Sequence, residues 1–314
     1  MSTNSRAEAF APASMGNVGI GFDILGLAFE EPGDTVIAEK RDERGAVILS
    51  IEGDGGVLPT DADKNTASIA VNAYLNATKI DCGVGIHLKK GLPLASGLGS
   101  SASSAVAAVF AVNALFDNPM SREELLPFCL EGEAAVSGYH LDNVGPSLLG
   151  GITLITGTTL GDIRRLPIPD NMHLALVTPK VAVKTSEARA VLPQSIPLKT
   201  LVLQTGWVAR MIDALYCGDI HAIALAMESD MVVEPARAHL MPLLNEARAS
   251  AKKAGALGLV ISGAGPTLCA VCDSASTANL VTHALKTVYM SAEIDCDVRY
   301  TQVNKVGARI LSVG

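Results

Sequence analysis

The chain has 314 residues, of which 32 are acidic and 24 basic, so its net charge at neutral pH is -8. This balance argues against nucleic acid as a partner, because neutralising phosphates requires clustered Lys and Arg, and no run of more than two basic residues occurs. The 49% hydrophobic content can fill the cores of roughly two domains. The longest apolar stretches are interrupted by polar residues, glycines or proline, so they predict no membrane-spanning helix.

The first half of the chain predicts both strands and helices. Alternation of apolar and polar residues indicates strands over 35–39, 47–51, 83–89 and 152–156. Helical periodicity predicts helices over 65–78 and 101–116. A third helix is predicted to open at Ser121, which forms a capping box with Glu124. Pro127 falls inside that helix, where a proline removes a backbone hydrogen bond.

The second half restarts the pattern after the prolines at 167 and 169. It predicts strands over 174–178, 259–262, 268–273 and 298–303, and helices over 198–216, 220–228, 235–253 and 278–289. The connections are not regular βαβ units, so we expect largely antiparallel strands in both halves and the α+β fold class. We place the domain boundary at the two prolines, which gives domains 1–168 and 169–314.

The six cysteines are spread through the chain, and only Cys269 and Cys272 lie close together. A pair with this spacing can bind metal or act in redox chemistry. Here it falls in a predicted strand, where residues three apart point to opposite faces, and we expect buried core cysteines. Residues 1–10 lack the apolar stretch of a secretion signal. We therefore expect a cytoplasmic protein with reduced thiols.

A glycine- and serine-rich loop, residues 91–104 with the sequence GLPLASGLGSSASS, follows a predicted strand and opens a predicted helix. Glycines let the backbone approach an anion, and the first free amides of a helix bind phosphate. The hydroxyls of Ser100 and Ser101 can donate to phosphate oxygens or ligate Mg²⁺. No Gly-Lys-Ser/Thr follows, so this is not a Walker loop. A serine-capped helix behind an ordinary turn is the alternative interpretation.

Residues 93–102, PLASGLGSSA, are similar to the central motif of the GHMP kinases. Two further segments resemble that family in the same order, PASMGNVGIGFDILG at 12–26 and SGAGPT at 262–267. The resemblance implies a two-domain fold, in which an N-terminal ATP-binding domain like the second domain of ribosomal protein S5 precedes a ferredoxin-like C-terminal domain. It also implies ATP in a cleft over the loop, with contacts from Pro93, Gly97, Leu98, Gly99, Ser100, Ser101, Ala102, Asn65 and Thr185.

Within this family the chain looks most like the homoserine kinases. The run NVGIGFDILG at 17–26, the segment SGYHLDNVGP at 137–146, and the arginine segments at 184–193 and 234–237 carry this resemblance. It implies that ATP phosphorylates the side-chain hydroxyl of L-homoserine to O-phospho-L-homoserine, on the route to threonine.

The charged groups of such a substrate have matching residues. A guanidinium forms bidentate hydrogen bonds with a carboxylate, so Arg189 and Arg237 suit the substrate carboxylate. The resemblance implies Asp23 for the ammonium and Asn17, His140, Asn143 and Gly263 for the remaining contacts. Taken alone, either arginine reads as a surface ion pair, and His140 as a structural residue.

Phosphoryl transfer depends on alignment and charge neutralisation. The resemblance implies Mg²⁺ ligation by Ser100 and Glu133, which with Asn143 form the expected catalytic set. Asn143 stands where mevalonate-phosphorylating relatives carry an aspartate, so no dedicated base is implied. We expect Asp142 to be structural, and Lys89, Lys184 and Thr185 to lie near the terminal phosphate.

Two other functions remain open at this stage. One is a related kinase acting on mevalonate, shikimate or another amino acid. The other is a nucleotide-binding regulator that has lost turnover. The sequence also leaves open whether the chain forms a homodimer.

Overall fold

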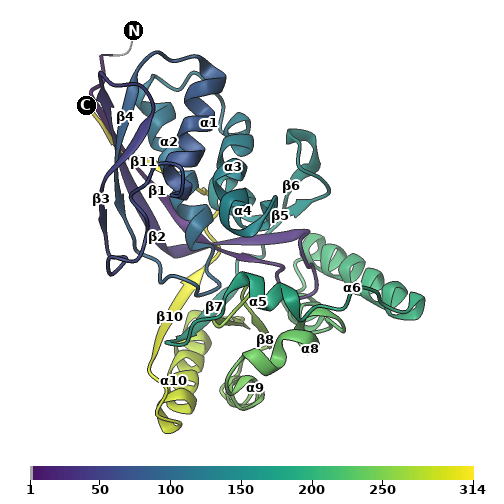
Figure 1. Cartoon of the computed structure of the whole chain (residues 1–314). Helices are drawn as coiled ribbons and strands as arrows, with labels where there is room; N and C mark the ends of the chain where they lie inside the picture. The colour runs from purple at the N-terminus through teal and green to yellow at the C-terminus, as the bar shows by residue number, and fades with distance from the viewer. Residues whose placement is uncertain (1–2) are drawn as a thin grey trace.

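The computed structural model describes residues 3–314, except for the side chain at position 160, and contains two sheets with helices packed on them (Figure 1). The first sheet has seven strands, with the order β11-β1-β2-β4-β3 and with β5 and β6 attached through β2. Its strands are β1 Arg6–Gly16, β2 Leu25–Arg41, β3 Ala46–Glu52, β4 Gly83–Lys89, β5 Ile152–Ile155, β6 Ile163–Leu166 and β11 Arg309–Val313. All their pairings are antiparallel except that of β3 with β4.

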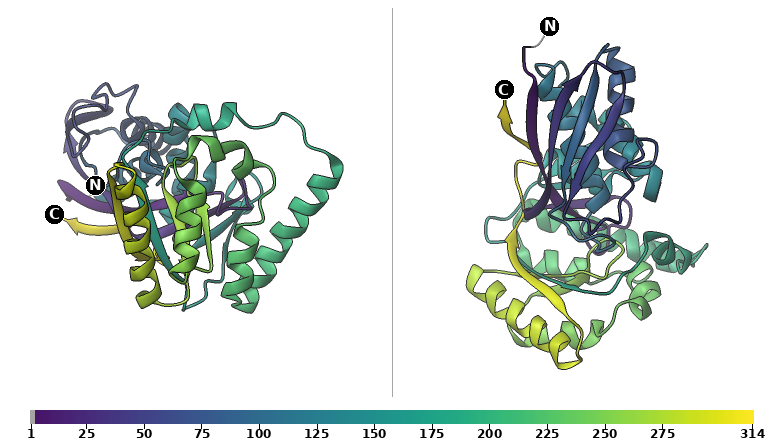
Figure 2. Two further views of the ribbon diagram at one scale, coloured as in Figure 1. Left: turned by 90° about the horizontal axis from the view of Figure 1, so that it is seen from below. Right: turned by 60° about the vertical axis from the view of Figure 1, so that its left-hand side comes forward.

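Helices cover one face of this first sheet (Figure 2). They are α1 Thr66–Thr78, α2 Ser100–Leu115, α3 Leu126–Ser137 and α4 Leu141–Leu149, with short turns η1 Glu123–Leu125 and η2 Leu160–Asp162. The central helix, α2, packs against the other three helices and against β1 and β2. Its alanines and serines are buried almost all around, which is the pattern of a helix inside a core.

The second sheet has four antiparallel strands in the order β10-β7-β9-β8, namely β10 Cys296–Gln302, β7 His173–Pro179, β9 Leu268–Cys272 and β8 Gly258–Ile261. Helices α9 Leu244–Lys253 and α10 Ala275–Ser291 run side by side on one face (Figure 2). The other elements of this half are α5 Thr185–Ala190, α6 Leu198–Cys217, α7 Ile220–Met227, α8 Val233–Arg237 and η3 Ala238–Leu240.

The structure confirms the α+β class and the largely antiparallel strands. The predicted boundary at residue 168 falls between β6 of the first sheet and β7 of the second, and the chain later returns to the first sheet with β11. The limits 1–168 and 169–314 stay a prediction.

Two predicted helices differ in detail, each at a proline. The helix expected from Ser121 opens as the 3₁₀ turn η1, which leads directly into α3 at Leu126, and Glu124 accepts the Ser121 amide at 2.7 Å. Pro127 lies in the first turn of α3, where the missing N–H is not needed. The helix expected over 235–253 is divided into α8, η3 and α9. Pro242 stands at the break, followed by Leu243 in a left-handed conformation.

The cysteine prediction is confirmed. Cys269 and Cys272 are fully buried and belong to different hydrophobic clusters on the two faces of β9. All six cysteines are free. Among residues 3–314, no helix is both long and apolar enough to cross a bilayer.

Candidate active site

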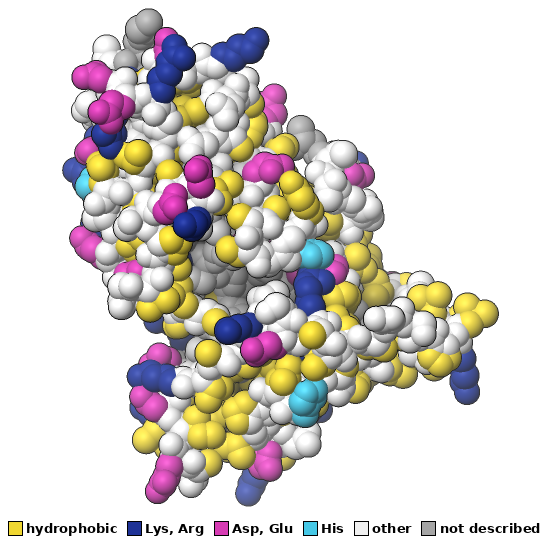
Figure 3. Space-filling model, in the orientation of Figure 1, with side chains coloured by type: hydrophobic (Ala, Val, Ile, Leu, Met, Phe, Trp, Pro, Cys, Tyr) yellow, Lys and Arg dark blue, Asp and Glu magenta, His cyan; other side chains and the backbone are white. Residues whose placement is uncertain are grey.

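A pocket of about 330 Å³ opens between the two halves, where the surface is hollowed (Figure 3). Its walls come from the loop before α2, from α3, from the turn between β1 and β2, and from α5 and α8. Most of the predicted site residues line it: Asn17, Asp23, Asn65, Gly97, Gly99, Ser100, Ser101, Glu133, His140, Asn143, Thr185, Arg189, Arg237 and Gly263. Segments far apart in sequence therefore meet in one cavity.

The glycine loop forms one wall and is held from both halves of the chain. Gly97 and Gly99 have φ of +79° and +65°, values that favour glycine. The carbonyl of Gly97 accepts a hydrogen bond from the Ser262 hydroxyl at 2.7 Å, and the carbonyl of Leu98 accepts one from the Ser14 amide at 3.0 Å. Helix α2 begins directly after Gly99 with no side-chain cap. Its first amides thus stay available at the pocket for an anion.

Three predicted nucleotide contacts, Pro93, Leu98 and Ala102, do not line the pocket. The side chains of Leu98 and Ala102 are buried in two hydrophobic clusters, and the Pro93 carbonyl accepts the Ser96 hydroxyl at 2.8 Å. Any ligand contact at Leu98 or Ala102 would have to come from the backbone. Asn65 caps α1 by accepting the Ala67 amide at 3.0 Å.

Two oxygens in this wall are buried without a hydrogen-bond partner, Oγ of Ser100 and Oε2 of Glu133. The other carboxylate oxygen of Glu133 accepts the Ser137 hydroxyl. Burial raises the pKa of Glu133, and the nearby hydroxyls of Ser101 and Ser137 and the charge of Lys90 oppose this shift. Hard oxygen donors of this kind, left unsatisfied, fit Mg²⁺, which takes one or two protein ligands alongside phosphates and water. Residues 3–314 contain no group of three or more His, Cys, Asp or Glu side chains that could hold a metal ion.

The opposite wall is charged. Arg189 donates to both carboxylate oxygens of Asp23, at 3.1 and 2.8 Å. His140 Nδ1 lies 3.7 Å from the same carboxylate. Burial lowers the pKa of His140, the charge of Asp23 opposes this shift, and Arg189 adds to it, so the site favours the neutral imidazole.

Arg237 is 3% exposed and is held by backbone oxygens. Its Nε donates to the Ala188 carbonyl at 2.9 Å and its Nη1 to the Gly263 carbonyl at 3.0 Å. The guanidiniums of Arg189 and Arg237 lie 5.5 and 5.4 Å from the centre of the Phe22 ring, a distance typical of a cation–π contact. Two cations are thereby kept close together on one face of the pocket.

Asn143 stands between the charged wall and the glycine loop. Its Oδ1 accepts the Ser14 hydroxyl at 3.1 Å, which leaves the amide nitrogen as the donor for a ligand. The adjacent Asp142 is buried at the start of α4. Burial raises the pKa of Asp142 to about 7, the charges of Asp23 and Glu133 add to this, and Arg189 opposes it.

Sequence reasoning missed Phe22 and Lys90, which line the pocket, and Ser14, which bonds Asn143. Ser14 and Phe22 lie inside the motif at 12–26, and only tertiary contacts reveal their roles. Lys90 lines the pocket, whereas the neighbouring Lys89 is exposed and does not, and Lys184 is likewise exposed outside it. Alternation along the strand would have placed Lys89 and Lys90 on opposite faces.

Comparison with known proteins agrees with this geometry. The GHMP kinases N terminal domain matches residues 65–151, and the GHMP kinases C terminal domain matches residues 211–289. The chain is 43% identical to a homoserine kinase of Chlorobaculum tepidum, over 96% of this chain and 97% of the relative. It is 36% identical to one of Xylella fastidiosa, over 98% and 95%.

The fold is similar to that of a solved homoserine kinase from Cytophaga hutchinsonii, with a TM-score of 0.94, 41% identity and 99% of each chain covered. A mevalonate kinase from L. major gives a TM-score of 0.72 at 17% identity, which shows the shared fold alone. These matches confirm the two-domain fold expected from the sequence.

Proposed function

The chain belongs to the homoserine kinases of the GHMP kinase family, and from this premise we propose that it transfers the terminal phosphoryl group of ATP to the side-chain hydroxyl of L-homoserine, giving O-phospho-L-homoserine. The observation that carries the proposal is that one pocket holds both an uncapped helix start and two buried or half-buried arginines. The first suits a nucleotide phosphate and the second an amino-acid carboxylate.

The substrate would lie along the charged wall. Its carboxylate would be held by Arg189 and Arg237, and its ammonium by Asp23, which in the ligand-free pocket is bonded to Arg189. Asn17 stabilises this wall, because its amide donates to the Gly263 carbonyl at 3.1 Å and its Oδ1 accepts the Asp23 amide at 3.1 Å. The neutral imidazole of His140 adds a polar contact without adding positive charge.

The reacting hydroxyl would be oriented by the amide nitrogen of Asn143. An amide cannot remove a proton at neutral pH, so it positions the nucleophile rather than acting as base. The loose transition state of phosphoryl transfer tolerates this, because little bonding to the attacking oxygen has formed at that point and its proton can leave late. Asp142 is adjacent, but Gly16 packs so closely against it that a Cβ at residue 16 would lie 2.2 Å from its Oδ2, and we assign it a structural role.

The nucleotide phosphates would lie on the first amides of α2 and on Ser100 and Ser101. We propose Mg²⁺ as the cofactor, held by the unsatisfied oxygens of Ser100 and Glu133. When bound with the nucleotide, this ion neutralises phosphate charge. Because burial raises the pKa of Glu133, the carboxyl group must lose its proton to act as a ligand, which favours binding at higher pH.

The test is ADP release with ATP and four acceptors: homoserine, serine, threonine and mevalonate. Homoserine should give the highest kcat/KM, and turnover should require Mg²⁺. Strong mevalonate phosphorylation with none of homoserine would assign a different acceptor. Nucleotide binding without ADP release from any acceptor would indicate a regulator.

Two further expectations remain proposals. Six free cysteines, four of them buried, are typical of a reducing compartment, which supports a cytoplasmic location. The N-terminal half of α6 projects from the molecule (Figure 1). It carries the exposed side chains of Leu198, Leu201 and Val202, and we propose it as the surface that a homodimer would use. Light scattering on the purified chain tests the second point.

A further inference from the structure

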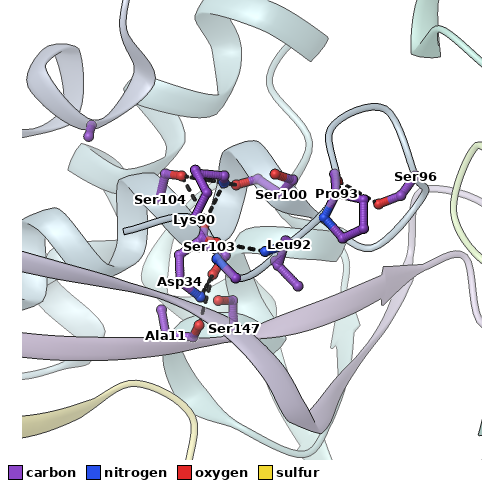
Figure 4. Close-up of polar contacts among 12 residues, drawn as sticks. Ala11, Asp34, Lys90, Leu92, Pro93, Ser96, Ser100, Ser103, Ser104 and Ser147 are labelled. Carbon is purple, nitrogen blue, oxygen red and sulfur yellow. Dashed lines mark hydrogen bonds and ion pairs between the residues drawn. The ribbon is translucent and has the colours of Figure 1, made fainter. Parts of the chain in front are cut away.

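Lys90, which lines the pocket, forms a buried ion pair with Asp34 beside the start of α2 (Figure 4). The side chains of Lys90 and Asp34 are 1% and 0% exposed. The Lys90 ammonium donates to the Asp34 carboxylate, to the Ser100 carbonyl at 2.9 Å and to the Ser104 hydroxyl at 2.8 Å. An ammonium has three N–H groups, so all of its donors are already engaged within the protein.

Asp34 is the centre of this network. Its Oδ1 accepts the amides of Gly91 and Leu92 at 3.0 and 3.3 Å, and its Oδ2 accepts the Ser104 hydroxyl at 2.8 Å. Its own backbone amide donates to Ser103 Oγ at 3.2 Å. One carboxylate therefore ties β2 to the start of the glycine loop and to the first turns of α2.

The atoms held by this network adjoin the atoms that face the ligand. Lys90 bonds the backbone carbonyl of Ser100, the first residue of α2, whose Oγ is buried without a partner. The charge of Lys90 also lowers the pKa of Glu133, against the larger effect of burial. A displacement of Lys90 would thus shift Ser100 and weaken the ionised form of Glu133 together.

A lysine beside a phosphate site is commonly a direct phosphate ligand. Here the ammonium of Lys90, although the residue lines the pocket, already donates to three protein acceptors, and it would have to give up at least one of these bonds to reach a phosphate. Leaving Asp34 unpaired in the core would be strongly unfavourable.

We propose that Asp34 and Lys90 are positioning residues that fix the start of α2, and with it Ser100, for binding of the metal–nucleotide complex, and that Lys90 is not itself a phosphate ligand. This inference rests on the proposed function, since it concerns the same pocket.

Lys90 as a positioning residue and Lys90 as a phosphate ligand predict different changes in activity for two variants. As a positioning pair, Lys90→Met and Asp34→Asn should act in the same direction. Both should lower kcat by about 10²-fold, as a displaced catalytic geometry does, and raise the Mg²⁺ concentration for half-maximal activity. The KM for homoserine should change less than about twofold in either variant. If Lys90 were a phosphate ligand, Asp34→Asn would release its ammonium, and that variant would keep or improve its activity with ATP. Lys90→Met would lose this activity. Such opposite effects of the two variants would overturn the proposal.

Each single variant leaves one buried charge without its partner, which can prevent folding. The double variant Asp34→Asn/Lys90→Met removes both charges, and Ser104→Ala removes a shared hydrogen-bond partner without stranding a charge. Circular dichroism and thermal unfolding identify the folded variants. A folded double variant should still show low kcat and an increased Mg²⁺ requirement. Wild-type values of both in that variant would contradict the positioning role.

The exposed pair Lys180 and Asp295, with Nζ and Oδ2 2.7 Å apart and both side chains more than half exposed, supplies the matched control. Lys180→Met/Asp295→Asn should change none of these parameters.

Calorimetric measurement of Mg·ADP binding without any acceptor separates the positioning role from the proposed function. Weaker binding in both Asp34→Asn and Lys90→Met would support the positioning role even if homoserine were the wrong acceptor, and unchanged binding in both would overturn it.

Discussion

Arg189 and Asp23 form a two-bond ion pair across the pocket, at 3.1 and 2.8 Å, although 166 residues separate them in the chain. Each is the proposed partner of an oppositely charged group on the substrate. In the ligand-free pocket they neutralise each other and place the guanidinium against Phe22. An amino acid with one carboxylate and one ammonium could exchange partners with this pair, so binding would leave no charge unpaired.

Replacement of Arg189 by alanine should raise the KM for homoserine by about 10- to 100-fold, the loss expected for charge-assisted hydrogen bonds. The KM for ATP should change less than about twofold, because the guanidinium of Arg189 is bonded to Asp23 and makes no hydrogen bond to the glycine loop. Initial rates with each substrate varied in turn provide the measurement. Arg210→Ala on α6, which removes an exposed arginine paired with Asp213, should have no effect. Equal losses for both substrates in Arg189→Ala would refute the carboxylate assignment.

Replacement of Glu133 by glutamine should lower kcat by about 10²-fold or more, because the proposed Mg²⁺ would lose an anionic ligand that neutralises charge in the transition state. The remaining activity should need more Mg²⁺. In the wild type, the apparent Mg²⁺ affinity should rise with pH, because burial raises the pKa of the Glu133 carboxyl and its proton competes with the cation.

Glu131→Gln is the control for this prediction, since Glu131 lies on the same helix, is exposed and contacts Tyr139. It should keep the wild-type Mg²⁺ titration. A Glu133→Gln variant with an unchanged Mg²⁺ requirement would mean that the cation binds elsewhere.

Asp142 should make the fold less stable as the pH rises. Its pKa is raised from 3.8 to about 7, chiefly by burial, so the folded state holds a proton between these values that the unfolded state has lost. Stability therefore falls with increasing pH across this window, by up to about 4 kcal/mol at 1.36 kcal/mol per pKa unit. Asp142→Asn should match the wild type near pH 4 and be more stable at pH 8, as measured by urea unfolding with EDTA present.

The matched control is Asp297→Asn, at an exposed position on β10. Its stability should follow the wild type at every pH. If Asp142→Asn shows the wild-type pH dependence, the carboxyl group is already ionised in the fold at neutral pH, and the proposed energetic role of its burial is wrong.

Elements with one clear periodicity could be predicted from the sequence, and those governed by tertiary contacts could not. β4 was predicted with its exact limits because it alternates, whereas β1 was missed because its second half is buried on both faces and rich in alanine. Helix α4 carries Pro146 and spans nine residues, so its local signal is weak. β11 joins the first sheet only by pairing with β1 from the other end of the chain.

The site shows the same division. Arg189, Arg237, Glu133 and the glycine loop lie in recognisable segments, and the structure brings them into one pocket. The roles of Ser14, inside the motif at 12–26, and of Asp34 could not be predicted, because they lie in hydrogen bonds to Asn143 and to the loop. Such supporting contacts depend on the packing of three or more distant segments, which a motif does not encode.

The backbone at Gly99 has no room for a side chain. Its φ is +65°, and an added Cβ would lie 2.2 Å from Ser14 Oγ and 2.9 Å from Asn143 Oδ1. Gly99→Ala would therefore push the proposed hydroxyl-orienting amide out of place, in addition to straining the backbone by about 1–2 kcal/mol. We expect kcat to fall by about 10²-fold, with a decrease in the free energy of unfolding of about 1–3 kcal/mol.

Gly206 provides the control, because it lies within α6 and an added Cβ would meet nothing within 4 Å. Gly206→Ala should keep full activity and raise the free energy of unfolding by about 0.5–1 kcal/mol, the ordinary difference between the two residues inside a helix. Activity assays and urea unfolding of both variants separate a local clash from a general effect of the substitution. Because the added methyl group at residue 99 would clash with Ser14 and Asn143, the lost activity of Gly99→Ala should appear in kcat. A Gly99→Ala enzyme with wild-type kcat would show that the amide of Asn143 does not orient the reacting hydroxyl.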